Sequence, residues 1–224
     1  MVSNLAYFYE TSRKVRGGKW VWVKDSNGEN RRNVLLGGTI LNPNKGFGHL
    51  WAAQLVEYKP AEGCLIFRSF KVAEQVAADA TTIKISADGY SDAPEVGMLL
   101  MVAPNSVDTT GQSTLVTAVA YDEANEVFNV TVSTALGAIV PANAIMVEAA
   151  GEEVSDEAEV LVKNPNTFVE ADRELMPTEG YGIANANYSI STVYDKQAWI
   201  ARMQPLPPYV LAKNRSYIDG IFWI

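Results

Sequence analysis

The chain has one cysteine and one histidine in 224 residues, and each scarcity excludes a class of site. Cys64 has no partner for a disulfide within the chain, and its alternating apolar surroundings predict a small buried side chain. Ordinary zinc sites need three or four such ligands and are excluded. A catalytic triad would have to use His49, beside which the sequence places no nucleophile or orienting carboxylate. We therefore expect no catalytic residue, no metal and no cofactor.

Long apolar runs and nucleotide-binding glycine motifs are also missing. No stretch reaches the roughly 18 apolar residues of a membrane-spanning helix, so no membrane contact is expected. The first residues, MVSNLAYFYETSRK, lack the basic region and long apolar run of a secretory signal peptide. There is no GxxxxGK[ST], HExxH or GxSxG motif. We expect the chain to fold in a reducing cytoplasm and to have a role other than catalysis.

Basic side chains are nearly absent from the middle of the chain. Residues 72–162 contain fifteen acidic side chains and one basic side chain, Lys84. The residues before them contain eleven basic and five acidic side chains, and those after them contain six of each. The formal charges are therefore +6, −14 and 0, which together give the net charge of −8. This partition indicates a basic end that docks on an acidic surface and an acidic module that faces solvent.

Two tryptophans, Trp20 and Trp22, lie among the basic residues near the start. This pattern leaves three interpretations open. Cations that track phosphate and aromatic rings that stack on bases would suit nucleic acid. An arm that docks on an acidic protein needs the same residues, and a solvated surface needs neither partner. The acidic pI near 4.8 and the −14 segment favour protein docking and argue against nucleic acid. The candidate docking residues are Arg13, Lys14, Arg16, Lys19, Trp20, Trp22, Arg31 and Arg32.

Alternating apolar residues predict a mainly β fold. Five short strands are expected in the middle of the chain, within 80–90, 95–104, 114–121, 127–134 and 144–151. Their spacing of about ten residues, with polar turns, is typical of a small β-barrel or sandwich. The hairpin 114–136 has the clearest pattern, with a turn at DEANE. We expect this module at 76–150, set as an insertion between an N-terminal segment, 1–75, and a C-terminal segment, 151–224, which could pair with each other.

The flanking segments give weaker patterns. A strand is expected at 33–36 and is expected to break at Gly37-Gly38. Residues 49–58 could form a helix or a strand, and the flanking Gly and Pro, which keep the segment short, favour a strand. Residues 64–74 alternate and suggest one strand. The acidic run 151–160 could bind a cation, but a solvated helix or linker is the simpler interpretation. A short helix is predicted around 195–203, followed by an extended proline-rich strap at 204–210.

Three stretches resemble head-fibre and capsid-decoration proteins of tailed bacteriophages. The first is LLGGTILNPNKGFGHLWAAQLVEYKP followed by LIFRSFKVAE. The second is the series ATTIKI, PEVGMLLMV, TLVTAVAYDEANEVFNVTV and LGAIVPANAIMVEAAG, which is similar to a small β-module that these proteins share. The third is the ending, PLPPYV and YIDGIFWI. WAAQL stands where the family pattern has an acidic G-D-L, and the absence of coiled-coil heptads means that no long fibrous shaft is encoded.

The resemblance implies a non-enzymatic structural protein of the virion, on the capsid exterior. It implies contact with the major capsid protein or another virion protein, and a homo-oligomer, with a trimer favoured. No functional residue transfers from the family, because its motifs are structural. We expect the oligomer contact in the apolar tail, whose candidate residues are Ile218, Ile221, Phe222, Trp223 and Ile224.

Two other functions fit the composition. A glycan-binding adhesion module would use exposed aromatic side chains in a shallow groove, with Tyr90, Tyr181 and Tyr188 as candidates. A carboxylate-based hydrolase would need an acidic pair across a cleft, and no pair stands out. Asp88, Asp92 and Asp108 could be calcium ligands, but they lack the spacing of an EF-hand and are better explained as turn-forming residues.

Overall fold

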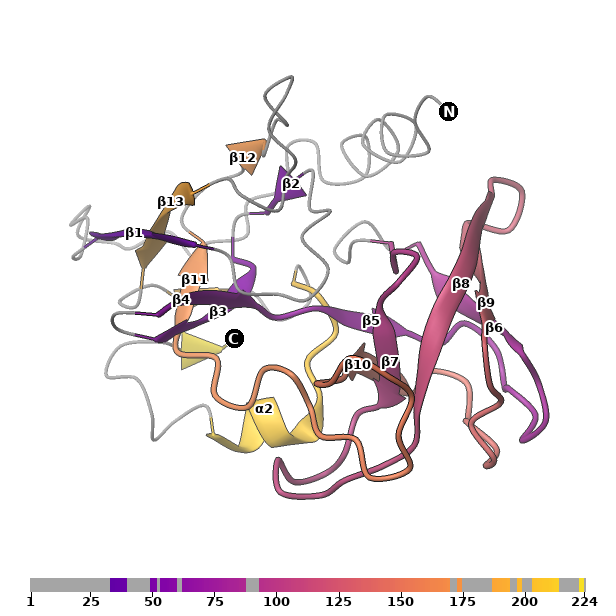
Figure 1. The fold of residues 1–224 in the computed structure, drawn as a ribbon. Helices are drawn as coiled ribbons and strands as arrows, with labels where there is room; N and C mark the ends of the chain where they lie inside the picture. Colours follow the sequence, from indigo (N-terminus) through magenta and orange to yellow (C-terminus); the bar gives the residue numbers. More distant parts are fainter. Residues whose placement is uncertain are drawn as a thin grey trace. The chain divides into compact units, whose positions relative to one another are not determined.

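The computed structural model describes residues 33–39, 49–51, 53–59, 62–87, 93–169, 173–174, 187–193, 197–198, 203–213 and 222–223. Within these residues the protein is mainly β, with two larger antiparallel sheets and one short helix (Figure 1). The chain divides into two compact units by its internal contacts. Unit 1 comprises Met1–Gly17, Arg68–Lys163 and Gln204–Tyr209, and unit 2 comprises Gly18–Phe67, Asn164–Met203 and Val210–Ile224.

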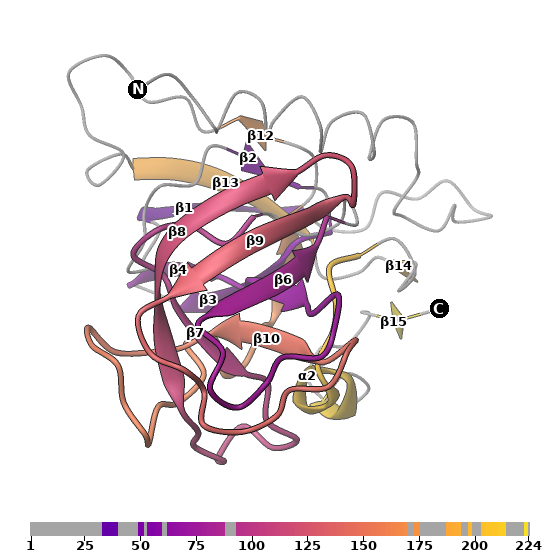
Figure 2. The same ribbon diagram turned by 90° about the vertical axis from the view of Figure 1, so that its right-hand side faces the viewer.

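Unit 1 is built on a six-stranded antiparallel sheet with the order β5-β10-β7-β8-β9-β6 (Figure 2). The strands are β5 (Ser69–Lys71), β6 (Thr82–Ser86), β7 (Leu99–Val102), β8 (Ser113–Asp122), β9 (Val127–Val132) and β10 (Ile145–Glu148). The five strands that the pattern predicts are all present, and β5 adds a sixth. Buried and more exposed side chains alternate along β6 and β9, because one face of each strand meets the core. The same alternation of apolar and polar residues in the sequence predicted these strands.

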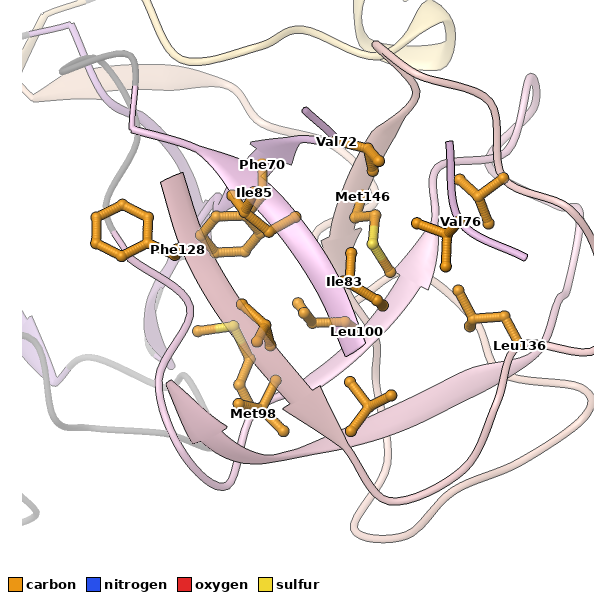
Figure 3. Close-up of a cluster of buried hydrophobic side chains, with 14 residues drawn as sticks. Phe70, Val72, Val76, Ile83, Ile85, Met98, Leu100, Phe128, Leu136 and Met146 are labelled. Atoms are coloured by element: carbon orange, nitrogen blue, oxygen red, sulfur yellow. The ribbon is translucent and has the colours of Figure 1, made fainter. Parts of the chain in front are cut away.

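The core of unit 1 is one cluster of fourteen buried side chains (Figure 3). Every strand of the sheet contributes to it, so the sheet curves around its own apolar face. Phe70 from β5, Ile83 from β6 and Met146 from β10 are completely buried. Because each buried side chain of this size contributes about 1.5–3 kcal/mol, this cluster supplies the main stabilisation of the unit.

The two edges of this sheet meet, although the sheet does not close into a barrel among the described residues. An isolated bridge joins Val72 to Ile85, and the amide of Ala73 donates to the carbonyl of Lys84 at 2.8 Å. The Lys84 ammonium also pairs with Glu74 at 2.9 Å. The continuation of β5 therefore touches β6 at one point instead of forming a ladder, so a closed barrel is not formed here.

The predicted hairpin at 114–136 is confirmed as β8 and β9. Ala118 pairs with Thr131 and Asp122 with Val127, which leaves four turn residues between the strands. The register shifts between Val116 and Ala118, where β8 carries a bulge. This long hairpin is visible at the front of Figure 2.

Unit 2 is built on a five-stranded antiparallel sheet with the order β1-β13-β11-β3-β4. The strands are β1 (Asn33–Thr39), β3 (Leu55–Lys59), β4 (Gly63–Ile66), β11 (Thr167–Val169) and β13 (Asn187–Val193). The edge strands β1 and β4 approach each other. Two small pairs complete the described part of the unit: β2 (His49–Leu50) with β12 (Arg173–Glu174), and β14 (Gln197–Ala198) parallel to β15 (Phe222–Trp223).

Two strand predictions in unit 2 were wrong in their extent. The expected break at Gly37-Gly38 does not occur, because β13 continues the ladder past it and pairs with Gly37 and Gly38 through Ser189 and Tyr188. The single strand expected at 49–58 is interrupted at Ala53, which has a φ of 64°. The amide of Gln54 donates to the carbonyl of Trp51 at 3.0 Å, which closes a turn between β2 and β3.

The single strand expected at 64–74 is two strands of different sheets. Residues 64–66 belong to β4 and pair with β3, whereas Ser69–Lys71 form β5 and pair with β10. All residues from Cys64 to Phe70 are buried, so the alternation in sequence does not mark an exposed face. The chain passes from unit 2 to unit 1 between Phe67 and Arg68, which explains the break.

The prediction of a helix around 195–203 is wrong at residues 197 and 198, because Gln197–Ala198 form strand β14. The helix lies later in the chain, as α2 (Pro208–Lys213). Proline suits the first position of a helix, since its fixed φ matches the helix and its missing amide hydrogen would have no helical partner. The proline-rich strap is therefore extended only up to residue 207.

Candidate interaction surface of unit 1

The acidic residues of unit 1 are mostly exposed. Thirteen acidic side chains between residues 72 and 162 are described, and ten of them are exposed. The ten are Glu74, Asp79, Asp108, Glu123, Glu126, Glu152, Glu153, Asp156, Glu157 and Glu159. Two places hold most of them, namely the loop 151–160 and the turn of the β8–β9 hairpin.

The acidic loop 151–160 contains no helix, so the prediction of a solvated helix is wrong and that of a linker remains. Backbone hydrogen bonds order the loop. Gly111 and Ala158 exchange two hydrogen bonds of 2.9 Å, and Ala149 bridges to Val160. The amide of Ser113 donates to the carbonyl of Ser155 at 2.9 Å. Ala158 and Val160 are buried at these contacts, whereas the carboxylates of the loop are exposed to solvent.

The turn of the β8–β9 hairpin is organised by Asp122. Its carboxylate accepts hydrogen bonds from the amides of Ala124 at 3.1 Å and Asn125 at 3.2 Å, and from Asn125 Nδ2 at 2.7 Å. The side-chain hydrogen bond from Asn125, followed by its backbone hydrogen bond, lowers the pKa of Asp122. Glu126 closes the turn with a φ of 52°. The turn therefore presents Glu123 and Glu126 on a fixed backbone.

An aromatic pair joins the two strands just below this turn. Tyr121 and Phe128 are cross-strand partners, and their ring centroids lie 5.1 Å apart. Partial burial, together with the charges of Glu126, Glu123 and Asp122, raises the pKa of Tyr121. Such pairs stabilise a hairpin by about 0.5–1.5 kcal/mol beyond their burial. The pair keeps the acidic turn attached to an ordered ladder.

Glu148 is the exception to the exposed acidic pattern. It is the one buried carboxylate among the described side chains, and it forms an ion pair with buried Arg68. Arg68 Nε donates to Glu148 Oε2 at 2.6 Å, and Arg68 Nη2 donates to Glu148 Oε1. The carboxylate is therefore neutralised by a two-point contact of the kind that guanidinium groups form with carboxylates. The sequence pattern missed this pair, since its members are 80 residues apart.

Within the described part of the chain, no group of three or more histidine, cysteine, aspartate or glutamate residues could hold a metal ion. Asp108, the one calcium candidate that is described, is exposed, and Asp88 and Asp92 lie outside the described residues. Exposed carboxylates repel other acidic surfaces, so these residues are suited to contact with water or with cationic partners.

The residues predicted to dock on a capsid all lie outside the described residues, and their role stays a prediction. Among the candidates for oligomer contact, Phe222 and Trp223 form β15, and Ile218, Ile221 and Ile224 lie outside. Tyr90 and Tyr181, proposed for glycan contact, also lie outside, and Tyr188 belongs to β13. The prediction for Cys64 is confirmed: it is 1% exposed, and burial raises the pKa of its thiol to about 11.

No protein-family model and no curated protein matches the chain. Within the described residues, the structure contains no helix that is both long enough and apolar enough to cross a membrane.

Proposed function

We propose that the protein is a non-enzymatic structural component of a phage virion, a head fibre or decoration protein on the outside of the capsid. The basic, tryptophan-bearing residues 13–32 would contact the major capsid protein or another virion protein. Residues 68–163 of unit 1 would be a barrel-like module inserted between the flanking segments, with their acidic surface facing solvent. The bridge between Val72 and Ile85, which brings the two sheet edges together, supports the barrel-like description.

The observation that carries this proposal is the distribution of carboxylates in unit 1. Ten of the thirteen described acidic side chains in 72–162 are exposed, and the one that is buried is neutralised by Arg68. A catalytic carboxylate needs a pocket that adjusts its pKa, whereas an acidic surface in water serves solubility and spacing. Copies arranged on a capsid would repel one another through this surface, and the opposite charge near residue 13 would direct attachment.

Attachment can be tested with capsids that lack the protein. Reversing Arg13, Lys14 and Arg16 to glutamate should weaken co-sedimentation of the purified protein with these capsids. Neutralising Glu152, Glu153 and Asp156 in the acidic loop is the matched control and should leave attachment unchanged. Because salt screens exposed charges with a Debye length of about 8 Å at 0.15 M, binding of the native chain should fall as salt rises. Full attachment of the charge-reversed chain at all salt concentrations would exclude this docking site.

Oligomerisation through the tail has a separate test. Deleting residues 217–224 would also remove β15 from β14, so a loss of oligomers would have two explanations. Replacing Ile221 and Ile224 with aspartate keeps the chain length and the residues of β15. If the tail joins copies, light scattering should show monomers for this variant at concentrations where the native chain is a trimer. An unchanged mass would place the contact elsewhere.

A further inference from the structure

A short segment near the carboxyl terminus is part of unit 1. Residues Gln204–Tyr209, called the strap below, group with unit 1, whereas the residues on either side of them group with unit 2. Gln204, Leu206 and Tyr209 are all buried, with Tyr209 only 2% exposed. The strap is separated by about forty residues of chain from the rest of unit 1, so its docking is not imposed by local sequence.

Two hydrogen bonds attach the strap to the ends of the main segment of unit 1. Ser69 Oγ donates to the carbonyl of Pro205 at 2.5 Å, and the Tyr209 hydroxyl donates to the carbonyl of Val162 at 3.2 Å. Ser69 lies one residue after the chain comes into unit 1, and Val162 lies one residue before it leaves. The strap thus contacts both the incoming and the outgoing segment.

The incoming and outgoing segments are themselves connected through Glu148 in β10. Glu148 binds the Arg68 side chain, and its amide donates to the carbonyl of Arg68 at 3.4 Å. The carbonyl of Glu148 accepts a hydrogen bond from the amide of Leu161 at 3.0 Å. The strap therefore fastens two segments that a buried ion pair already aligns.

Docking of the strap increases the number of points at which the chain passes between the two units. With the strap docked, the chain passes between the units at four described points, 67/68, 163/164, 203/204 and 209/210. With the strap released, only the first two of these points connect unit 1. The strap belongs to no ladder of strands in the described structure, and its docking includes these two hydrogen bonds and the burial of its side chains.

We propose that the strap is a releasable clasp that holds the incoming and outgoing segments of unit 1 together. Docked, it stabilises the junction of residues 68–69 and 161–162. Released, it leaves 67/68 and 163/164 as the connections of unit 1 within the described residues, and the chain segments at these points open more readily than the sheet. The clasp is a property of the single chain and does not depend on the proposed attachment to a capsid.

Amide hydrogen exchange of the full chain tests the clasp. Tyr209→Phe removes only the hydroxyl that binds Val162, and its loss of one hydrogen bond should raise exchange in 68–71 and 160–163 about fivefold. Tyr209→Ala also removes the buried ring and should raise exchange there by about a hundredfold or more. Leu211→Ala, which changes a side chain 40% exposed in the same helix, is the matched control and should leave exchange unchanged.

The outcomes separate a clasp from a passive tail. Faster exchange in both the strap and the two junction segments supports the proposal. Faster exchange in the strap alone, or in none of these segments, overturns it. If Tyr209→Ala unfolds the whole chain, Tyr209→Phe and Ser69→Ala decide in the same way, since each removes one hydrogen bond and little volume.

Cross-linking shows whether the strap docks on its own chain. In a Cys64→Ala background, the pair Ser69→Cys and Pro205→Cys is treated with a short bis-maleimide. A product that migrates as a single chain is expected, since the carbonyl of Pro205 lies 2.5 Å from Ser69 Oγ. The chain with Ser69→Cys alone is the control for random coupling between copies. Cross-linked dimers above the control level would mean that straps are exchanged between copies and would overturn the proposed clasp.

Discussion

Unit 1 and unit 2 draw their strands from the sequence in different ways. In unit 1, β7, β8 and β9 follow one another along the chain and pair as neighbours. In unit 2, β1 pairs with β13 across some 150 residues of chain, and the side chain of Asn166 binds the backbone of Tyr58 from 108 residues away. Local pairings need only short loops, whereas the pairings of unit 2 form only after distant segments meet. The comparison explains why the sequence pattern was clearer in unit 1.

The units also differ in charge and in natural probes. Unit 1 contains sixteen acidic and seven basic side chains, whereas unit 2 contains ten acidic and eleven basic ones. Cys64 belongs to unit 2 and is buried there. Labelling of its thiol therefore reports on unit 2, and amide exchange of the β8–β9 hairpin reports on unit 1.

The largest effects are expected from matched cavities in the two cores. Phe70 in unit 1 and Phe168 in unit 2 are both 0% exposed. Replacing either with alanine should lower the free energy of unfolding by about 3–5 kcal/mol. Phe70→Ala should affect exchange in the hairpin most, and Phe168→Ala should affect the rate of Cys64 labelling most.

Val96→Ala, at a side chain 61% exposed, serves as the control for these cavities and should change neither probe. If each phenylalanine variant changes both probes equally, the two units unfold as one, and the contrast between them applies to their topology alone.

The buried ion pair should give a large but non-additive effect. Arg68→Met or Glu148→Leu alone leaves one charge buried and should cost about 3–5 kcal/mol in urea unfolding followed by hairpin exchange. The double variant, which replaces the pair with apolar side chains, should recover most of that loss. A double variant whose loss equals the sum of the single losses would show that the two side chains act independently.

A smaller effect, confined to unit 2, is expected at Asn166. Its Oδ1 accepts from the amide of Tyr58 at 2.7 Å, and its Nδ2 donates to the carbonyl of Tyr58 at 2.9 Å. Asn166→Ala removes both bonds and should cost about 1–3 kcal/mol, measured by Cys64 labelling in urea. Asn105→Ala, at an exposed position of unit 1, should leave the labelling rate as it is. If both variants change the labelling rate equally, the two hydrogen bonds of Asn166 are not what stabilises unit 2.

The smallest effect is a pH dependence at the hairpin turn. Because hydrogen bonds from Asn125 and Ala124 lower the pKa of Asp122 in the folded chain, the stability they confer is complete above the pKa of the unfolded chain. It is lost as the pH falls through the folded pKa. Acid titration followed by NMR should therefore shift the amide signals of residues 124 and 125 in this range. Asp122→Asn keeps an acceptor but removes the charge, and should abolish the titration; persistence of the shift would assign it to another group.

The sequence predicted the parts of the fold that depend on local pattern. The β8–β9 hairpin, the strands of the acidic segment and the burial of Cys64 follow from alternation and turn residues, and they are confirmed. The continuation of β1 through Gly37 and Gly38 depends on a partner, β13, that lies far along the chain. No local signal revealed that partner, so glycine propensity alone gave the wrong answer.

At the candidate surface, too, local sequence pattern could not reveal contacts between distant residues. Counting charges placed Glu148 with the other acidic residues of the middle segment, yet it is buried because Arg68 meets it across a β pairing. A carboxylate amid the apolar residues of β10 was the only signal that could have singled it out. The helix α2 was missed because its prolines suggested an extended strap, although Pro208 stands at the position where helices accept proline.

Imaging of virions tests the central claim most directly. Cryo-electron microscopy maps of virions made with and without this protein should differ by density on the outer capsid surface, with the acidic residues 68–163 directed away from the shell. Identical virions, or protein density inside the capsid or absent from it, would contradict the proposed function.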